Sequence, residues 1–119
     1  MTRFAALRAV RELAGCSDGE ISSLLRYTDV VEVSAGALVA VQAHLAATFV
    51  VVMEGSLRAG SCLLRQGDSF GWNAMWERTP NPFTVVAESD ARLLVMSHDQ
   101  FRAAKGATRS GELRVLAPA

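Results

Sequence analysis

The side chains best suited to chemistry in this sequence are two histidines and two cysteines, and their spacing does not join them into a site. His44 lies in an apolar run, and His98 follows Ser97 at the start of a predicted helix. A histidine metal centre would need two clustered histidines and a carboxylate. Cys16 and Cys62 have no C-x-x-C spacing and no neighbouring histidine, as is typical of thiols in a reducing cytoplasm. We therefore expect no metal, no cofactor and no disulfide.

Composition and charge exclude several further classes of function. No spacing brings a nucleophile, a base and an orienting group together, so we expect no enzyme activity. Twelve Lys and Arg balance twelve Asp and Glu in 119 residues, so no overall field attracts nucleic acid or acidic lipid. Charged residues interrupt the N-terminal apolar stretch, and residues 37–53 contain polar side chains unsuited to a membrane span. We expect a cytoplasmic protein with neither a nucleic-acid nor a membrane partner.

Two helices are predicted ahead of the first strand. Apolar residues recur at helical spacing and the pattern stops at Gly15, which indicates an amphipathic helix carrying Phe4, Leu7, Val10 and Leu13. Ser17 and Glu20 have the spacing of a capping box, in which each side chain bonds the other's backbone N–H. This box predicts a second helix that runs to about Tyr27.

Beyond Thr28 the hydrophobic period shortens from near four to near two, which predicts short strands. The apolar runs cover residues 31–33, 38–41, 49–53, 55–58, 62–64, 83–87 and 92–96. A tight turn at 59–61 suits a hairpin, with Gly60 supplying a positive φ. A second capping box, from Ser97 to Gln100, opens a short helix over residues 101–104.

This order of elements predicts a mainly β domain with flanking helices. We expect an antiparallel, jelly-roll-like β-roll of about eight short strands, two N-terminal helices and a short C-terminal helix, within residues 1–104. Residues 105–119 are rich in Gly, Ala, Ser and Pro and are expected to form a disordered tail.

The arrangement resembles the cyclic nucleotide-binding domain of catabolite activators and of the protein kinase A regulatory subunit. The resemblance spans residues 13–101 and is most specific in Gly-Asp-Ser-Phe-Gly-Trp-Asn-Ala-Met at 67–75, followed by Phe-Thr-Val-Val-Ala at 83–87. Gly36 and Gly55 also fall where the family keeps structural glycines. No helix-turn-helix is expected after the roll, so the resemblance does not extend to DNA binding.

In that family the segment equivalent to residues 70–84 is the phosphate-binding cassette, where backbone N–H groups at a short helix face an anion. The resemblance places the ribose-binding glutamate at Trp72 and the phosphate-binding arginine at Asn81. The next residue, which in the family donates a backbone N–H, is Pro82, which has none. Losing two charge-assisted bonds costs about 3–6 kcal/mol, or roughly two to four decades in affinity. We therefore expect weak binding of cAMP and cGMP, if any.

The resemblance implies a candidate ligand pocket built from Phe70, Gly71, Trp72, Asn73, Ala74, Asn81, Pro82, Phe83 and Thr84. Trp72 can stack on a ligand or fill the cavity with its N–H bonded to a carbonyl, and we favour the second hypothesis. Trp76, one helical turn later, is expected to join it in a packed cluster.

Three nearby polar residues have alternative interpretations. Arg78 can replace the lost positive charge, but a turn arginine beside Glu77 is more often solvated or paired outward. Asn81 can cap the preceding helix instead of touching a ligand. Thr84 can contact a ligand or serve as an ordinary β-branched strand residue.

Two functions fit the sequence. The first is a stand-alone regulatory or sensor domain for an unidentified small molecule, acting on a protein effector. The alternative is a structural or protein-interaction roll without a ligand, whose partner is another protein or a second copy. A large exposed apolar patch would favour the alternative.

Overall fold

A computed structural model describes residues 1–109 of the chain, with side chains described as far as Ala104. The helical elements are α1 (Arg3–Arg8), η1 (Arg11–Leu13), α2 (Asp18–Leu24), η2 (Leu25–Tyr27), α3 (Trp72–Glu77) and α4 (His98–Arg109). The strands are β1 (Asp29–Val33), β2 (Leu38–Ala40), β3 (Thr48–Glu54), β4 (Leu57–Ala59), β5 (Cys62–Leu64), β6 (Ser69–Phe70), β7 (Val85–Ala87) and β8 (Ala91–Ser97).

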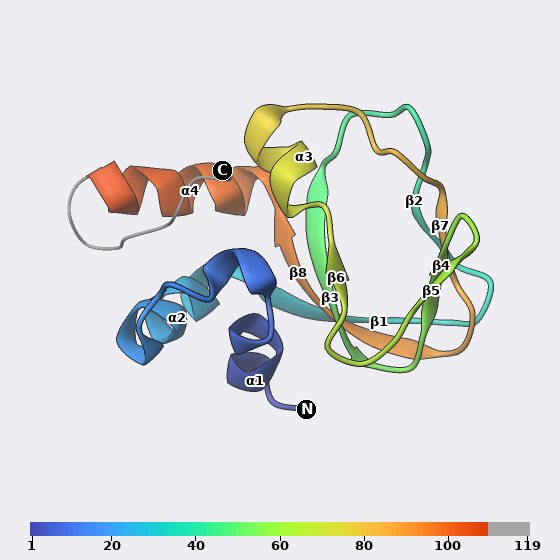
Figure 1. Ribbon diagram of the computed structural model, residues 1–119, viewed down its shortest axis with the longest axis horizontal. Helices are drawn as coiled ribbons and strands as arrows, with labels where there is room; N and C mark the ends of the chain where they lie inside the picture. The colour runs from blue at the N-terminus through green and yellow to red at the C-terminus, as the bar shows by residue number, and fades with distance from the viewer. Residues whose placement is uncertain (110–119) are drawn as a thin grey trace.

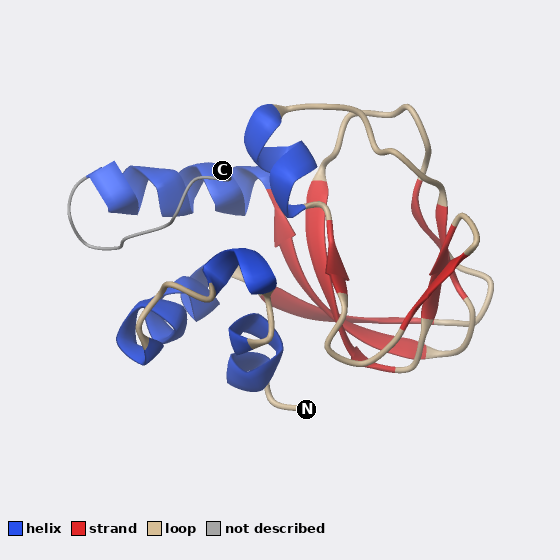
Figure 2. Ribbon diagram, viewed as in Figure 1, coloured by secondary structure: helices blue, strands red, loops and turns tan. Residues whose placement is uncertain are grey.

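The strands form two four-stranded antiparallel sheets, in the orders β1-β8-β3-β6 and β2-β7-β4-β5. Figure 1 shows the two sheets facing each other as a roll, with α1, α2 and α4 beside the first sheet and α3 at one end of the roll. Colouring by secondary structure shows how the helices gather on one side of the strands (Figure 2). The predicted β-roll between terminal helices is confirmed.

The buried side chains form two clusters, and β3 contributes to both. Alternate side chains of a strand point to opposite faces. Phe49 and Val51 lie in the cluster between the first sheet and the helices, whereas Val50 and Val52 lie inside the roll. Both faces of β3 are therefore covered, which explains the uninterrupted apolar run that predicted this strand.

The first predicted helix is wrong in its continuity, because α1 ends at Arg8 and η1 begins at Arg11. Val10 between them has extended backbone, with ψ 120°. The Arg8 guanidinium donates to the carbonyls of Leu13 at 2.6 Å and Cys16 at 2.8 Å, which holds the chain in a turn instead of a straight helix. Of the residues that the apolar period marked, Leu7, Val10 and Leu13 are nevertheless buried, and Phe4 is partly buried.

Both predicted capping boxes are present. The Ser17 hydroxyl accepts from the Glu20 N–H at 3.1 Å, and the Ser17 N–H donates to the Glu20 carboxylate at 2.9 Å. Ser97 and Gln100 exchange the same two bonds at 3.2 and 2.8 Å.

The second box opens a longer helix than expected, because α4 continues to Arg109. Alanines at 103 and 104 favour helix, and Phe101 and Ala104 are anchored in the helix-side core. The predicted tail therefore begins inside α4, and its residues 110–119 lie outside the described residues. Within the described part of the chain, no helix combines the length and apolarity needed to cross a membrane.

Candidate functional site

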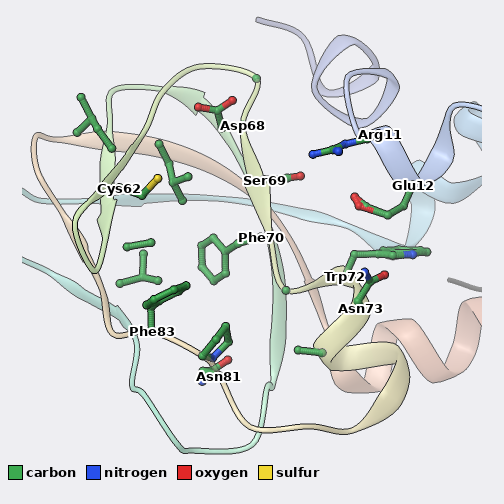
Figure 3. Close-up of a pocket in the computed structure, with 18 of the residues that line it drawn as sticks. Arg11, Glu12, Cys62, Asp68, Ser69, Phe70, Trp72, Asn73, Asn81 and Phe83 are labelled. Carbon is green, nitrogen blue, oxygen red and sulfur yellow. The ribbon is translucent and has the colours of Figure 1, made fainter. Parts of the chain in front are cut away.

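A pocket of about 680 Å³ opens beside α3 and the interior of the roll (Figure 3). Its walls come from β4, β5, β6, the start of α3, the segment before β7, and η1. Eight of the nine residues assigned to the pocket from the sequence line it: Phe70, Gly71, Trp72, Asn73, Ala74, Asn81, Pro82 and Phe83. The ninth, Thr84, lies outside the lining.

Gly71 sets the position of α3 in the wall of this pocket. Its φ is +94°, a conformation that residues with a Cβ rarely adopt. A Cβ at this position would lie 2.7 Å from the carbonyl oxygen of Thr48 in β3. Close contact with the first sheet therefore requires glycine at the start of α3.

Trp72 is turned away from the interior of the roll (Figure 3). Its side chain is only 3% exposed and packs edge-on against Phe49 at 5.2 Å and Phe101 at 5.8 Å between ring centroids. Trp76 stacks nearly parallel to it at 6.4 Å. We call these four residues the aromatic cluster; it joins α3 to α4 and confirms the expected packing of the two tryptophans.

Two details of the Trp72 hypothesis are wrong. The indole does not plug the pocket, because its ring lies in the aromatic cluster and contributes only part of the wall. Its Nε1 is buried without an acceptor among the described residues, so the expected bond to a carbonyl is absent. Contacts with three aromatic rings favour this orientation of the Trp72 side chain. Each aromatic pair is worth about 0.5–1.5 kcal/mol beyond its buried area.

Asn81 and Thr84 hold the loop that follows β2. Asn81 Nδ2 donates to the carbonyl of Val41 at 3.0 Å, and its backbone N–H donates to that of His44 at 2.7 Å. The Thr84 hydroxyl accepts from the Gln42 N–H at 3.1 Å. Asn81 is therefore a loop anchor instead of the helix cap considered from the sequence, and its side-chain amide already donates one hydrogen bond to the loop.

The interior of the roll offers an apolar surface to a ligand. Phe70 from β6 and Phe83 from the segment before β7 both project into this space (Figure 3). Leu63 and Leu64 of β5 add aliphatic surface. Phe83 is 52% exposed. A flat apolar group placed here would gain contact with two aromatic rings.

Sequence reasoning missed the charged residues at the pocket, Arg11 and Glu12 of η1 and Asp68 of the turn before β6. Arg11 is the single cationic side chain among the described lining residues. One Asp68 oxygen accepts from the Arg65 N–H at 2.8 Å. No sequence spacing signalled η1, because its residues reach the pocket only through the turn at Val10.

Arg78 does not supply the missing cassette charge. It ends α3 with φ +61°, and its guanidinium lies 2.7 Å from Nε2 of His98 at the start of α4. Arg78 is outside the pocket lining. The outward-paired interpretation of this arginine is confirmed, since Arg78 contacts His98 and does not line the pocket.

The comparisons with known proteins agree on the architecture. Residues 30–105 match the model of the cyclic nucleotide-binding domain. No curated protein matches the sequence.

Solved structures with the same fold include the regulatory domain of Toxoplasma gondii PKA with cAMP (TM-score 0.71, 22% identity, 91% of this chain and 46% of that one). A cyclic nucleotide-binding-like protein from Brucella abortus matches with TM-score 0.74 and 15% identity, over 85% of this chain and 95% of that one. The N-terminal domain of a Streptomyces coelicolor transcriptional regulator matches with TM-score 0.76 and 16% identity, over 92% and 85%.

The chain spans about half the length of the Toxoplasma chain. At these identities the likenesses show the fold alone, whereas the family model matches well over half of the chain. The β-roll, the glycine-started α3 and the family match together show that this chain belongs to the cyclic nucleotide-binding domain family.

Proposed function

We propose that this domain is a non-catalytic regulatory module that binds a small molecule in the pocket between η1, β6 and α3, and that it does not bind cAMP or cGMP tightly. The observation that carries the proposal is an open pocket whose nucleotide-gripping groups are absent. Trp72 is packed into the aromatic cluster, Asn81 anchors a loop, and Pro82 has no N–H to offer. A pocket of about 680 Å³ with aromatic walls still suits a small organic ligand.

The aromatic cluster supports a regulatory role. Trp72 lies in the pocket wall and contacts Phe101 of α4. A ligand that displaces α3 therefore changes the packing of α4, the helix that leads out of the roll. Binding would shift the population of α4 positions by the difference in ligand affinity between them.

The alternative function, a protein-interaction scaffold, is favoured by a separate observation. Leu38 is 61% exposed and Leu45 is 55% exposed. Both line a second depression of about 220 Å³ beside β2. An exposed apolar patch can mark a protein contact, so a second copy or another protein would cover these residues.

The test separates the two functions with a pair of substitutions on one helix. Asn73 is exposed and lines the pocket, whereas Glu77 is exposed on the same helix and does not. Purified domain is screened against a metabolite panel that includes cAMP and cGMP, first by thermal shift and then by isothermal titration calorimetry. At a hundredfold excess over Kd, a ligand stabilises the fold by about 2.7 kcal/mol. The stabilising ligand should act on the parent and on Glu77→Trp, and Asn73→Trp should abolish its effect.

Two results would overturn the proposal. A saturable cAMP or cGMP isotherm with Kd below about 0.1 mM would show that the cassette still grips a nucleotide. Indifference to every compound, together with a concentration-dependent dimer in sedimentation equilibrium, would favour the scaffold.

A further inference from the structure

One side of the pocket lies inside the roll, and apolar side chains line it. The hairpin of β4 and β5 pairs Leu57 with Leu64 and Ala59 with Cys62, and residues paired in this way project from the same face. Leu57 and Ala59 belong to the cluster inside the roll, so Leu64 and Cys62 face the same interior. We call this part of the pocket the roll compartment. The residues that line it are Ala59, Cys62, Leu64, Phe70, Phe83 and Val85.

Two phenylalanine rings reach the roll compartment from different sheets. Phe70 belongs to β6 of the first sheet, whereas Phe83 precedes β7 of the second. Both rings project into the compartment (Figure 3). The Phe83 ring lies against the β4–β5 turn, where a Cβ added at Gly60 would be 3.0 Å from its Cδ1. This contact holds the ring in place while the side chain stays 52% exposed, so a ligand can cover it.

The charged groups at the pocket lie outside the roll compartment. Arg11 and Glu12 lie on the other side of β6, toward η1 (Figure 3). Asp68 lies in the turn before β6, where one of its oxygens accepts from the Arg65 N–H at 2.8 Å. These three are the charged side chains among the described residues that line the pocket. A charged group bound in the roll compartment would therefore lose hydration without gaining a charged side chain as its partner.

Asn81 offers a neutral polar contact at the same pocket. One N–H of its side-chain amide donates to the carbonyl of Val41 at 3.0 Å. An amide has a second N–H and a carbonyl oxygen, which can bond an uncharged polar group. The polar contact that Asn81 provides therefore suits an amide or hydroxyl substituent on an otherwise apolar ligand.

We propose that the roll compartment binds an uncharged, flat aromatic molecule. Its ring system contacts Phe70 and Phe83, and a neutral polar substituent bonds the Asn81 amide. Contacts between aromatic rings are favourable beyond the area that they bury. A neutral molecule also avoids the cost of removing a charge from water. The inference rests on the proposed small-molecule function and names the class of its ligand.

Three planar compounds of matched shape test the preference for a neutral ligand. Near neutral pH, 2-naphthamide is uncharged, 2-naphthoate is an anion and 2-naphthamidine is a cation. Calorimetric titration should rank 2-naphthamide first, with a Kd at least about tenfold lower than that of either charged compound. Equal binding of 2-naphthoate would show that an anion finds donors at the start of α3. Equal binding of 2-naphthamidine would show that a carboxylate reaches the compartment, and either result would overturn the proposal.

Cys62 reports whether the compound occupies the roll compartment. Cys62 is exposed, whereas Cys16 is buried, so iodoacetamide should modify Cys62 first. At about ten times its Kd, 2-naphthamide should slow this modification about tenfold, as measured by intact mass. The same concentration of 2-naphthoate should slow it less than about twofold. If bound 2-naphthamide leaves the rate unchanged, the compound lies elsewhere and the proposal is wrong.

A pair of substitutions tests the aromatic contact. Phe83→Leu keeps an apolar side chain but removes the ring, and it should weaken 2-naphthamide binding about 3- to 10-fold. Leu45→Ala is the control, because Leu45 is 55% exposed and lies outside the lining of this pocket. It should leave the affinity unchanged. An unchanged affinity in Phe83→Leu would contradict the assignment of an aromatic ligand.

Failure of this inference and failure of the proposed function give different results. The ligand class is wrong if none of the three compounds binds, or if a charged one binds as tightly as 2-naphthamide. A compound from the metabolite panel that stabilises the domain would then leave the small-molecule function standing. Indifference to every compound, together with a concentration-dependent dimer, would overturn both.

Discussion

Gly71→Ala is expected to destabilise the domain by about 2–5 kcal/mol, because two separate costs fall on one added methyl group. The first is the backbone conformation, since φ is +94° and the left-handed region costs an L-residue about 1–2 kcal/mol. The second is steric, since the Cβ would lie 2.7 Å from the Thr48 carbonyl oxygen. β3 is covered on both faces and cannot yield, so α3 must shift, at about 1–3 kcal/mol for overpacking.

Two other glycines separate these costs. Gly36 has φ +87°, but a Cβ added there would meet no atom within 4 Å, so Gly36→Ala should cost only the conformational part, about 1–2 kcal/mol. Gly19 lies in α2 without a positive φ, and its nearest contact would be 3.8 Å away. Gly19→Ala should therefore stabilise the domain by about 0.5–1 kcal/mol.

Urea denaturation followed by far-ultraviolet circular dichroism measures all three, with equal m-values as the check on two-state behaviour. From most to least stable, the expected order is Gly19→Ala, the parent, Gly36→Ala and Gly71→Ala. If Gly71→Ala lowers the free energy of unfolding no more than Gly36→Ala does, the close contact between Gly71 and the Thr48 carbonyl has no steric cost. The explanation of how α3 is placed in the pocket wall would then be refuted.

Three further predictions concern the aromatic cluster, the loop anchor and a surface ion pair. Trp72→Ala should cost about 3–5 kcal/mol in urea denaturation, whereas Trp72→Phe should cost much less, because the buried indole N–H has no acceptor to lose; equal losses would contradict this. Asn81→Ala should lower the free energy of unfolding by about 1 kcal/mol, because it removes the 3.0 Å bond to the Val41 carbonyl. Amide hydrogen exchange should become faster in the loop after β2. An unchanged exchange rate there would argue against the anchor. Arg58 lowers the pKa of Glu88 through a side-chain hydrogen bond at 3.0 Å and its charge. The contribution of this exposed pair to folding stability is fully present at pH values above the pKa of Glu88 in the unfolded chain, and it is lost as the pH falls through the lower pKa of the folded protein. Arg58→Gln should therefore raise the pKa of Glu88, measured by NMR titration of the carboxyl group, toward its ordinary value.

Local signals explain which parts of the fold were predictable from the sequence. The capping boxes at Ser17 and Ser97 need only residues three positions apart, and both appear with the expected bonds. The apolar run of β3 likewise marks its own burial. The break at Val10 was not predictable, because it depends on where the Arg8 guanidinium finds carbonyl partners after the chain has turned.

The pocket, like the fold, was only partly predictable from the sequence. Its cassette wall is contiguous in sequence and was named through the family resemblance, whereas Arg11 and Glu12 reach it from η1. The orientation of Trp72 depends on Phe101, which belongs to the far end of the described chain. Only the folded arrangement decides that the indole enters the aromatic cluster instead of the roll.

The aromatic cluster also gives the protein a built-in optical label. The sequence contains two tryptophans, and both lie on α3. Their parallel rings are 6.4 Å apart, and Phe101 contacts both of them. Tryptophan emission, excited at wavelengths that Tyr27 does not absorb, therefore reports on α3 and its contact with α4. A change in that emission when a compound is added would locate the response to this junction without any engineered fluorophore.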